Sequence, residues 1–164
     1  GVTGVCTLLR PESRGSVRIR SADPREAPAI DPNYLATQKD REVIVAGVKA
    51  LRRIFEAPSL ARHIAEEIEP GPACRSDDEL LDFIRRRGST TYHPVSTCRM
   101  GQDAKAVVDE RLRVRGIDRL RVIDASIMPA VVSGNTNAAT IMIGEKGAAM
   151  VLEDAKAGSM ARAA

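Results

Sequence analysis

Two short polar segments of the sequence carry side chains that can do acid–base chemistry. The first, residues 90–101 (TTYHPVSTCRMG), holds His93, one of two histidines in the chain. Because Pro94 disfavours a helical backbone at the preceding residue, we expect the imidazole to be presented from an extended segment or the end of a loop. An imidazole can exchange a proton near neutral pH, although a lone loop histidine is more commonly a hydrogen-bonded structural residue. Cys98 could form a nucleophilic pair with it, but no pattern in the sequence brings the two together.

The second segment, residues 133–137 (SGNTN), directly precedes a predicted helix. The first backbone N–H groups of a helix have no acceptor within the helix and carry the positive end of its dipole, so they can hold an anionic oxygen. Asn and Thr at such a position are equally typical of ordinary helix capping. The spacing alone does not choose between an anion site and a cap.

The elements that must position these segments follow from periodicity, capping residues and turn residues. They indicate an α+β fold, with an antiparallel sheet and helices on one of its faces. In the first part of the chain we expect a hairpin of strands 2–9 and 15–21 and then a connection over 22–33. Helices are expected from Thr37 to about residue 57, over 60–68, from Ser76 to Gly88 and from Ala138 to about Ala155. Two further strands are expected over 107–115 and 120–123, and a frayed tail over 158–164.

Composition and charge exclude several classes of protein. With 43% hydrophobic but only 2% aromatic residues, the core of this 164-residue chain must be aliphatic, and a stacking platform for single-stranded nucleic acid is ruled out. The formal net charge is +3, and acidic residues are interspersed with basic ones, so nucleic acid is not an expected partner. The densest basic run, residues 85–87, falls in the last turn of a predicted helix, where cations are favoured.

The number and spacing of the cysteines indicate whether the chain holds disulfides or a metal ion. The length of its apolar runs indicates whether it can span a membrane. Cys6, Cys74 and Cys98 are odd in number and have no zinc-ligand spacing, so we expect neither a disulfide framework nor a metal. No apolar run approaches the roughly 18 residues that span a bilayer. We therefore expect a cytoplasmic protein without a transmembrane segment, peripheral to a membrane at most through an electron acceptor.

Several ordered motifs together resemble one family, the glucose–methanol–choline (GMC) flavoprotein oxidoreductases, and within it the branch of choline dehydrogenase and related alcohol dehydrogenases. The resemblance covers about residues 5–152. The motifs are residues 93–101 (HPVSTCRMG), 108–109 (VD), 112–114 (LRV), 120–129 (LRVIDASIMP), 133–138 (SGNTNA) and 140–146 (TIMIGEK), with 9–17 (LRPESRGSV) and 30–35 (IDPNYL) upstream.

The resemblance implies an enzyme that oxidises the CH–OH group of a small alcohol to an aldehyde, with FAD as its cofactor. It places His93 as the catalytic proton acceptor and Asn137 at the second catalytic position. The residues that it places against FAD are Asp124, Ala125, Asn135, Thr136 and Ala138. Ser96 departs from the family pattern, which commonly has Gly there, and its side chain is expected to narrow the substrate mouth.

By the same resemblance, residues 1–92 form a region like the family's substrate domain, and residues 93–157 form a catalytic segment that completes an FAD-binding domain. No GxGxxG phosphate-binding turn occurs in the chain. The implied partner is therefore an N-terminal FAD-binding portion of the same enzyme. Without it, apolar surface at Ile123, Ile127, Ile141 and Ile143 predicts poor solubility or self-association into a homo-oligomer. The alternative is a catalytically silent fragment or interaction module that keeps only the fold.

Overall fold

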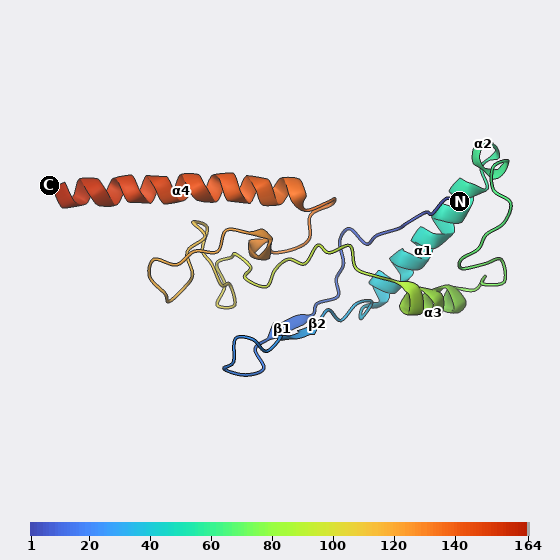
Figure 1. Cartoon of the computed structure of the whole chain (residues 1–164), viewed down its shortest axis with the longest axis horizontal. Coiled ribbons are helices and arrows are strands. Elements are labelled where there is room, and N and C mark those ends of the chain that lie inside the picture. The colour runs from blue at the N-terminus through green and yellow to red at the C-terminus, as the bar shows by residue number, and fades with distance from the viewer. Residues whose placement is uncertain (164) are drawn as a thin grey trace. The chain divides into compact units, whose positions relative to one another are not determined.

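A computed structural model describes the backbone of residues 1–163 and the side chains of residues 1–157. The chain divides into two compact units, residues 1–91 and residues 92 onward (Figure 1). The roles predicted for residues 1–92 and 93–157 stay predictions, and the predicted fraying of 158–164 concerns residues beyond the described side chains. In chain order the elements are β1 (Ser16–Arg18), β2 (Ala29–Asp31), α1 (Gln38–Phe55), α2 (Pro58–Ala61), α3 (Asp77–Arg87), the 3-10 turn η1 (Ala125–Ile127) and α4 (Asn137–Ala163).

The α+β class is confirmed, but the sheet is smaller than expected and is paired differently. It consists of β1 and β2 alone, antiparallel, with Ser16 opposite Asp31 and Arg18 opposite Ala29. The prediction that strand 2–9 pairs with 15–21 is wrong, because the partner comes from the stretch expected to be a connection. Every residue of β1 is exposed, so within the described residues no helix lies on that strand.

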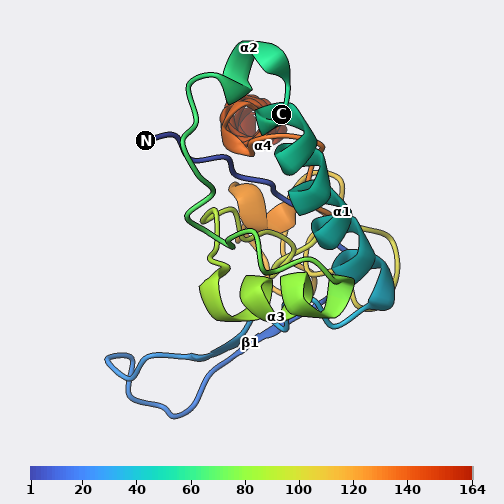
Figure 2. The ribbon, with the colours of Figure 1, turned by 90° about the vertical axis from the view of Figure 1, so that its right-hand side faces the viewer.

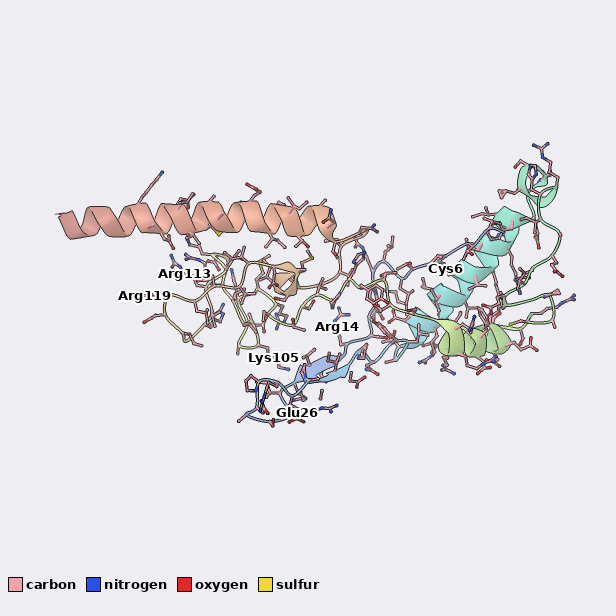
Figure 3. The ribbon with its side chains drawn as sticks, viewed as in Figure 1. Cys6, Arg14, Glu26, Lys105, Arg113 and Arg119 are labelled. Carbon is pink, nitrogen blue, oxygen red and sulfur yellow. The ribbon has the colours of Figure 1, made fainter. Side chains whose placement is uncertain are left out.

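Residues 2–9 are extended without belonging to a sheet. Gly4, Cys6 and Leu8 are half-buried and the residues between them are exposed, which is the alternation of a strand. The inward side faces α1: a Cβ on Gly4 would lie 2.7 Å from the Phe55 ring, and one on Gly47 would lie 3.2 Å from Cys6 Cβ. Figure 3 shows Cys6 beside α1. The predicted alternation of buried and exposed residues is confirmed, but residues 2–9 pack against a helix and not against a second strand.

Helices α1 and α3 begin where their capping residues predict. The Thr37 hydroxyl accepts from Asp40 N, and Ser76 with Glu79 forms a reciprocal capping box. The basic run 85–87 occupies the last turn of α3, which confirms its helix-end placement. The two helices pack at an angle around the fully buried Leu80 (Figure 2).

The helix expected over residues 60–68 is wrong beyond its first turn. Its place is taken by α2 and then by a loop that Arg52 of α1 holds. The guanidinium donates to Glu67 Oε1 at 2.9 Å, to the Gly71 carbonyl at 3.0 Å and to the Cys74 carbonyl at 2.7 Å. Because one guanidinium supplies several donors in a rigid plane, it satisfies this loop without helical hydrogen bonds.

A buried carboxylate ties the first part of the chain to α1. Asp40, only 2% exposed, accepts from Glu12 N at 2.9 Å and from Ser13 N at 2.8 Å, and the Ser13 hydroxyl donates to it at 2.5 Å. The same Ser13 oxygen accepts from Ala36 N at 2.9 Å. Burial alone would raise the pKa of Asp40, but these hydrogen bonds outweigh it and hold the pKa below its ordinary value.

The second unit is built around an aliphatic core rather than a sheet. The core consists of Val108, Leu112, Ile127, Met128 and Ile143. The strands predicted over 107–115 and 120–123 are present only as isolated bridges, among them Val108 with Val114 and Arg113 with Arg121. Of the isoleucines expected to lack a partner, Ile127 and Ile143 are buried in this core and Ile123 packs against it, whereas Ile141 remains 59% exposed. None of the described helices has the length and apolar character needed to cross a bilayer.

Replacing Asp40 by Asn tests the role of this carboxylate. An amide presents only one oxygen to the three donors, so we expect a loss of about 1–3 kcal/mol of unfolding free energy at pH 7. Since the folded pKa is depressed, the stabilisation exists above the unfolded pKa of about 3.9 and is lost as the pH falls below it. Urea unfolding between pH 2 and 7 should therefore show a shallower acid limb for Asp40→Asn. The exposed Asp23→Asn is the control, and equal loss in both variants contradicts the assignment.

Candidate active site

His93 lies in an irregular segment of the second unit, between Tyr92 and Pro94, and its side chain is half-buried. Tyr92 has a left-handed backbone with φ 60°, and residues 93–96 belong to no helix or strand. The expectation of an imidazole presented from a loop is therefore confirmed. Cys98 is also half-buried and is a free thiol.

The segment after His93 runs along η1 and is joined to it by three hydrogen bonds. The Ser96 hydroxyl donates to the Met128 carbonyl at 2.7 Å, Cys98 N to the Ser126 carbonyl at 3.1 Å, and Met100 N to the Ile127 carbonyl at 2.8 Å. The Ser96 hydroxyl thus faces η1, and its expected narrowing of a substrate mouth stays a prediction. Since Ile127 and Met128 are core residues, these bonds attach the segment to the core of the unit.

Asp124 and Ala125, two of the five residues expected to contact FAD, form the beginning of the same turn. The Asp124 carboxylate accepts from Ser126 N at 2.7 Å and so caps η1, while its side chain remains exposed. Ala125 is half-buried against the core. The local role of Asp124 is thus to shape the turn.

The second polar segment leads into α4 as expected. Asn135, Asn137 and Ala138 are exposed, whereas Thr136 is buried and its carbonyl accepts from Thr140 N at 2.9 Å. The first turn of α4 contains no acidic residue. The positive end of the helix dipole is therefore not neutralised by a side chain of its own first turn, which suits an anionic oxygen.

The segment after His93 and the helix that begins at Asn137 both contact η1. Among the described side chains, no hydrogen bond joins His93 to Asn137. The His93 segment is bonded to η1, and α4 packs against the same turn through Ile143. The segment that follows His93 and the helix that begins at Asn137 are therefore both attached to η1, where Asp124 is the cap and Ala125 the first residue. No group of three His, Cys, Asp or Glu side chains in the described part of the chain could hold a metal ion.

At its other end α4 is held by a charged cluster that the sequence analysis missed. Asp154 binds Arg111 at 3.0 Å, Arg113 at 2.5 Å and also Arg121; we call these four residues the Asp154 cluster. Figure 3 shows Arg113 next to α4. The hydrogen bond from Arg113, together with the other arginines, lowers the pKa of Asp154 to about 2. The signal was available in the spacing, because residues 143, 147, 150 and 154 share one helical face.

Gly147 on that face permits close packing rather than nucleotide binding. A Cβ at Gly147 would lie 2.4 Å from Ile123 Cγ2, so only glycine lets Ile123 reach the helix backbone. Between the η1 contact and the Asp154 cluster, α4 is thus fixed along the length of its inner face.

The family model of the GMC oxidoreductases matches residues 11–144, which is most of the chain. The chain belongs to the GMC oxidoreductase family. This confirms the resemblance drawn from the motifs, which run through both polar segments.

Among curated GMC relatives, an alcohol dehydrogenase [acceptor] of Pseudomonas putida is 54% identical over 148 residues, covering 90% of this chain and 27% of the relative. An oxygen-dependent choline dehydrogenase of Cronobacter sakazakii is 47% identical, covering 84% of this chain and 25% of the relative. The matches fall in the C-terminal part of these longer proteins.

Solved structures of GMC proteins agree in fold. A pyridoxine 4-oxidase described as from Mesorbium loti has a TM-score of 0.80 at 44% identity, covering 85% of this chain and 27% of that one. An FAD-dependent oxidoreductase from Chaetomium thermophilum has a TM-score of 0.84 at 32% identity, covering 90% of this chain and 26% of that one. The chain thus spans about a quarter of the length of the proteins that it matches.

Replacing Asp154 by Asn tests whether the Asp154 cluster holds α4. The folded pKa of about 2 lies below the ordinary 3.9, so the carboxylate stabilises the fold above pH 4 and loses this effect as the pH falls towards 2. At pH 7 we expect the thermal midpoint of Asp154→Asn to fall by about 3 °C, and below pH 3 the variant and the parent should converge. Glu153→Gln, which removes a single exposed ion pair, is the control. A midpoint that responds equally to both changes contradicts this assignment.

Proposed function

We propose that this chain is the C-terminal part of an FAD-dependent oxidoreductase that oxidises the CH–OH group of a small alcohol to an aldehyde. The observation that carries the proposal is the common attachment of the His93 segment and of α4, which begins at Asn137, to η1 in a member of the GMC family. The names of the relatives, alcohol dehydrogenase [acceptor] and choline dehydrogenase, support an alcohol as the substrate class.

In this proposal His93 is the proton acceptor. Oxidation of an alcohol requires that its hydroxyl proton leave, and an imidazole within hydrogen-bond reach can take it at neutral pH. The half-buried position of His93 limits access of water to the ring. The segment that follows it is bonded to η1, and such an attachment favours proton transfer by orientation.

Asn137 is the second polar group of the proposed site. Its exposed carboxamide lies at the first position of α4. The amide N–H₂ group can donate to the substrate oxygen while negative charge develops there, a contact of the oxyanion type. The helix dipole adds to this effect because its positive end faces the same region.

The residues present fit an FAD isoalloxazine, which when bound supplies the chemistry of accepting a hydride from the carbinol carbon. The start of α4 and the residues before it, with Asn135 and Ala138 exposed and Thr136 buried, would lie against the pyrimidine oxygens through backbone N–H groups. No acidic side chain in the first turn opposes the negative charge there. Asp124 and Ala125 would border the diphosphate and ribityl part beside η1.

The outer face of α4 supports completion of an FAD-binding domain by a further portion of the protein. Ile141, Met142, Val151 and Leu152 are between 41% and 62% exposed, although the opposite face is already packed on the core. These apolar side chains are interspersed on that face with the charged Glu145, Lys146 and Glu153, and exposed apolar side chains gathered on one face are typical of a contact surface. We propose that the N-terminal, FAD-binding portion covers this face, as the coverage of only a quarter of the relatives allows.

The 164-residue chain alone should bind FAD weakly or not at all, because it has no GxGxxG turn to cradle the diphosphate. Flavin absorbance after reconstitution and gel filtration measures this directly. A yellow protein with stoichiometric flavin would contradict the proposal that FAD binding requires the N-terminal portion.

Substitution of the two site residues tests the chemistry in a complete protein. We suggest a chimaera in which this chain replaces the matching C-terminal segment of the Pseudomonas putida relative. With a primary alcohol and an artificial electron-accepting dye, His93→Ala should lower kcat by about 10² to 10⁴, and Asn137→Ala by about 10², with flavin content retained in both.

His63→Ala is the matched control for His93, because His63 is the only other histidine and is exposed in the first unit. Full activity of His93→Ala would contradict the proposed role. A chimaera that carries flavin but oxidises no alcohol would favour the alternative of a silent module.

A further inference from the structure

Ser96 combines an unusual backbone with a buried hydrogen bond. Its φ of 74° lies in the left-handed region, which residues with a Cβ adopt rarely and glycine adopts freely. Its hydroxyl donates to the Met128 carbonyl at 2.7 Å. The backbone of Ser96 is therefore strained, and the hydrogen bond of its side chain to the Met128 carbonyl offsets this strain.

The acceptor of that bond belongs to the core. Met128 is 5% exposed and is the residue at which η1 ends. No N–H group of a helical turn reaches the carbonyl at its end. When that carbonyl is buried, it therefore needs a hydrogen-bond donor from another segment. Ser96 supplies that donor, and the backbone bonds of Cys98 and Met100 to Ser126 and Ile127 continue the same attachment.

The path from this bond to the imidazole is short and stiff. Only Pro94 and Val95 lie between His93 and Ser96. The proline ring fixes φ at residue 94, and Val95 packs against the core. The bond of Ser96 and the packing of Val95 therefore both constrain the segment that carries His93.

We propose that Ser96 is a positioning residue that sets the place of the His93 imidazole through its hydrogen bond to the Met128 carbonyl. This inference rests on the proposed function of His93 as proton acceptor. Without the bond the segment would keep its two backbone attachments further along and the packing of Val95, but it would lose the polar attachment nearest to His93, so the position of the ring should be less sharply defined. Proton transfer depends on an approach of about 3 Å, so a small displacement should lower kcat more than it changes KM.

Two variants separate the hydroxyl from the backbone strain. Ser96→Ala removes the hydrogen bond and keeps a Cβ at positive φ, whereas Ser96→Gly removes the bond and relieves the strain. Thr97→Ala, which removes an exposed hydroxyl one residue away, is the matched control. If Ser96→Ala fails to fold, Ser96→Gly still decides the question.

The first readout needs neither flavin nor activity. In the 164-residue chain carrying His63→Gln, the remaining imidazole signal in a ¹H–¹³C spectrum is that of His93. We expect one narrow His93 resonance with Ser96 intact and with Thr97→Ala. In Ser96→Gly and Ser96→Ala the resonance should shift and broaden. An unchanged resonance in Ser96→Gly would overturn the inference.

The second readout is kinetic, in the chimaera with 1-butanol and an artificial electron-accepting dye. We expect both Ser96 variants to lower kcat by about tenfold, with KM changed by less than about twofold. A Ser96→Gly variant with the parent's kcat would overturn the inference. If the unsubstituted chimaera binds flavin but oxidises no alcohol, the proposed function fails, while the His93 resonance still decides whether Ser96 positions the ring.

Discussion

The attachment of two separate segments to one buried turn is the constraint on which the proposed site depends. The carbonyl groups of Ser126, Ile127 and Met128 each accept a hydrogen bond from the segment after His93. The side chains of Ile127 and Met128 pack in the core with Ile143 of α4. This turn thus anchors both the segment that follows His93 and helix α4, and the Asp124 cap stabilises the turn itself.

Helix α4 depends on its inner face being fixed at several points. Gly147 lets Ile123 touch the helix backbone, and the Asp154 cluster holds the helix further along. These contacts set the direction of the first turn of α4, although they lie further along the helix than Asn137. Exposed apolar side chains on the outer face of α4 support the proposal that a further portion of the protein covers this helix.

The helices could be predicted because their start signals are local. Thr37 and Ser76 cap α1 and α3 within one turn, and periodic apolar residues follow. The partner of a strand is not a local property: residues 2–9 have the alternation of a strand, but Gly4 and Gly47 let them pack on α1. The site residues followed from the family motifs, whereas the bond from Ser96 to Met128 joins residues 32 positions apart and has no signature in the sequence.

A crystal structure of the flavin-containing chimaera with a bound alcohol analogue tests the central claim most directly. We expect one imidazole nitrogen of His93 and the Asn137 carboxamide nitrogen both to lie about 3 Å from the same ligand oxygen. A structure in which either side chain turns away from the ligand, with the ligand oxygen held by other groups, would contradict it.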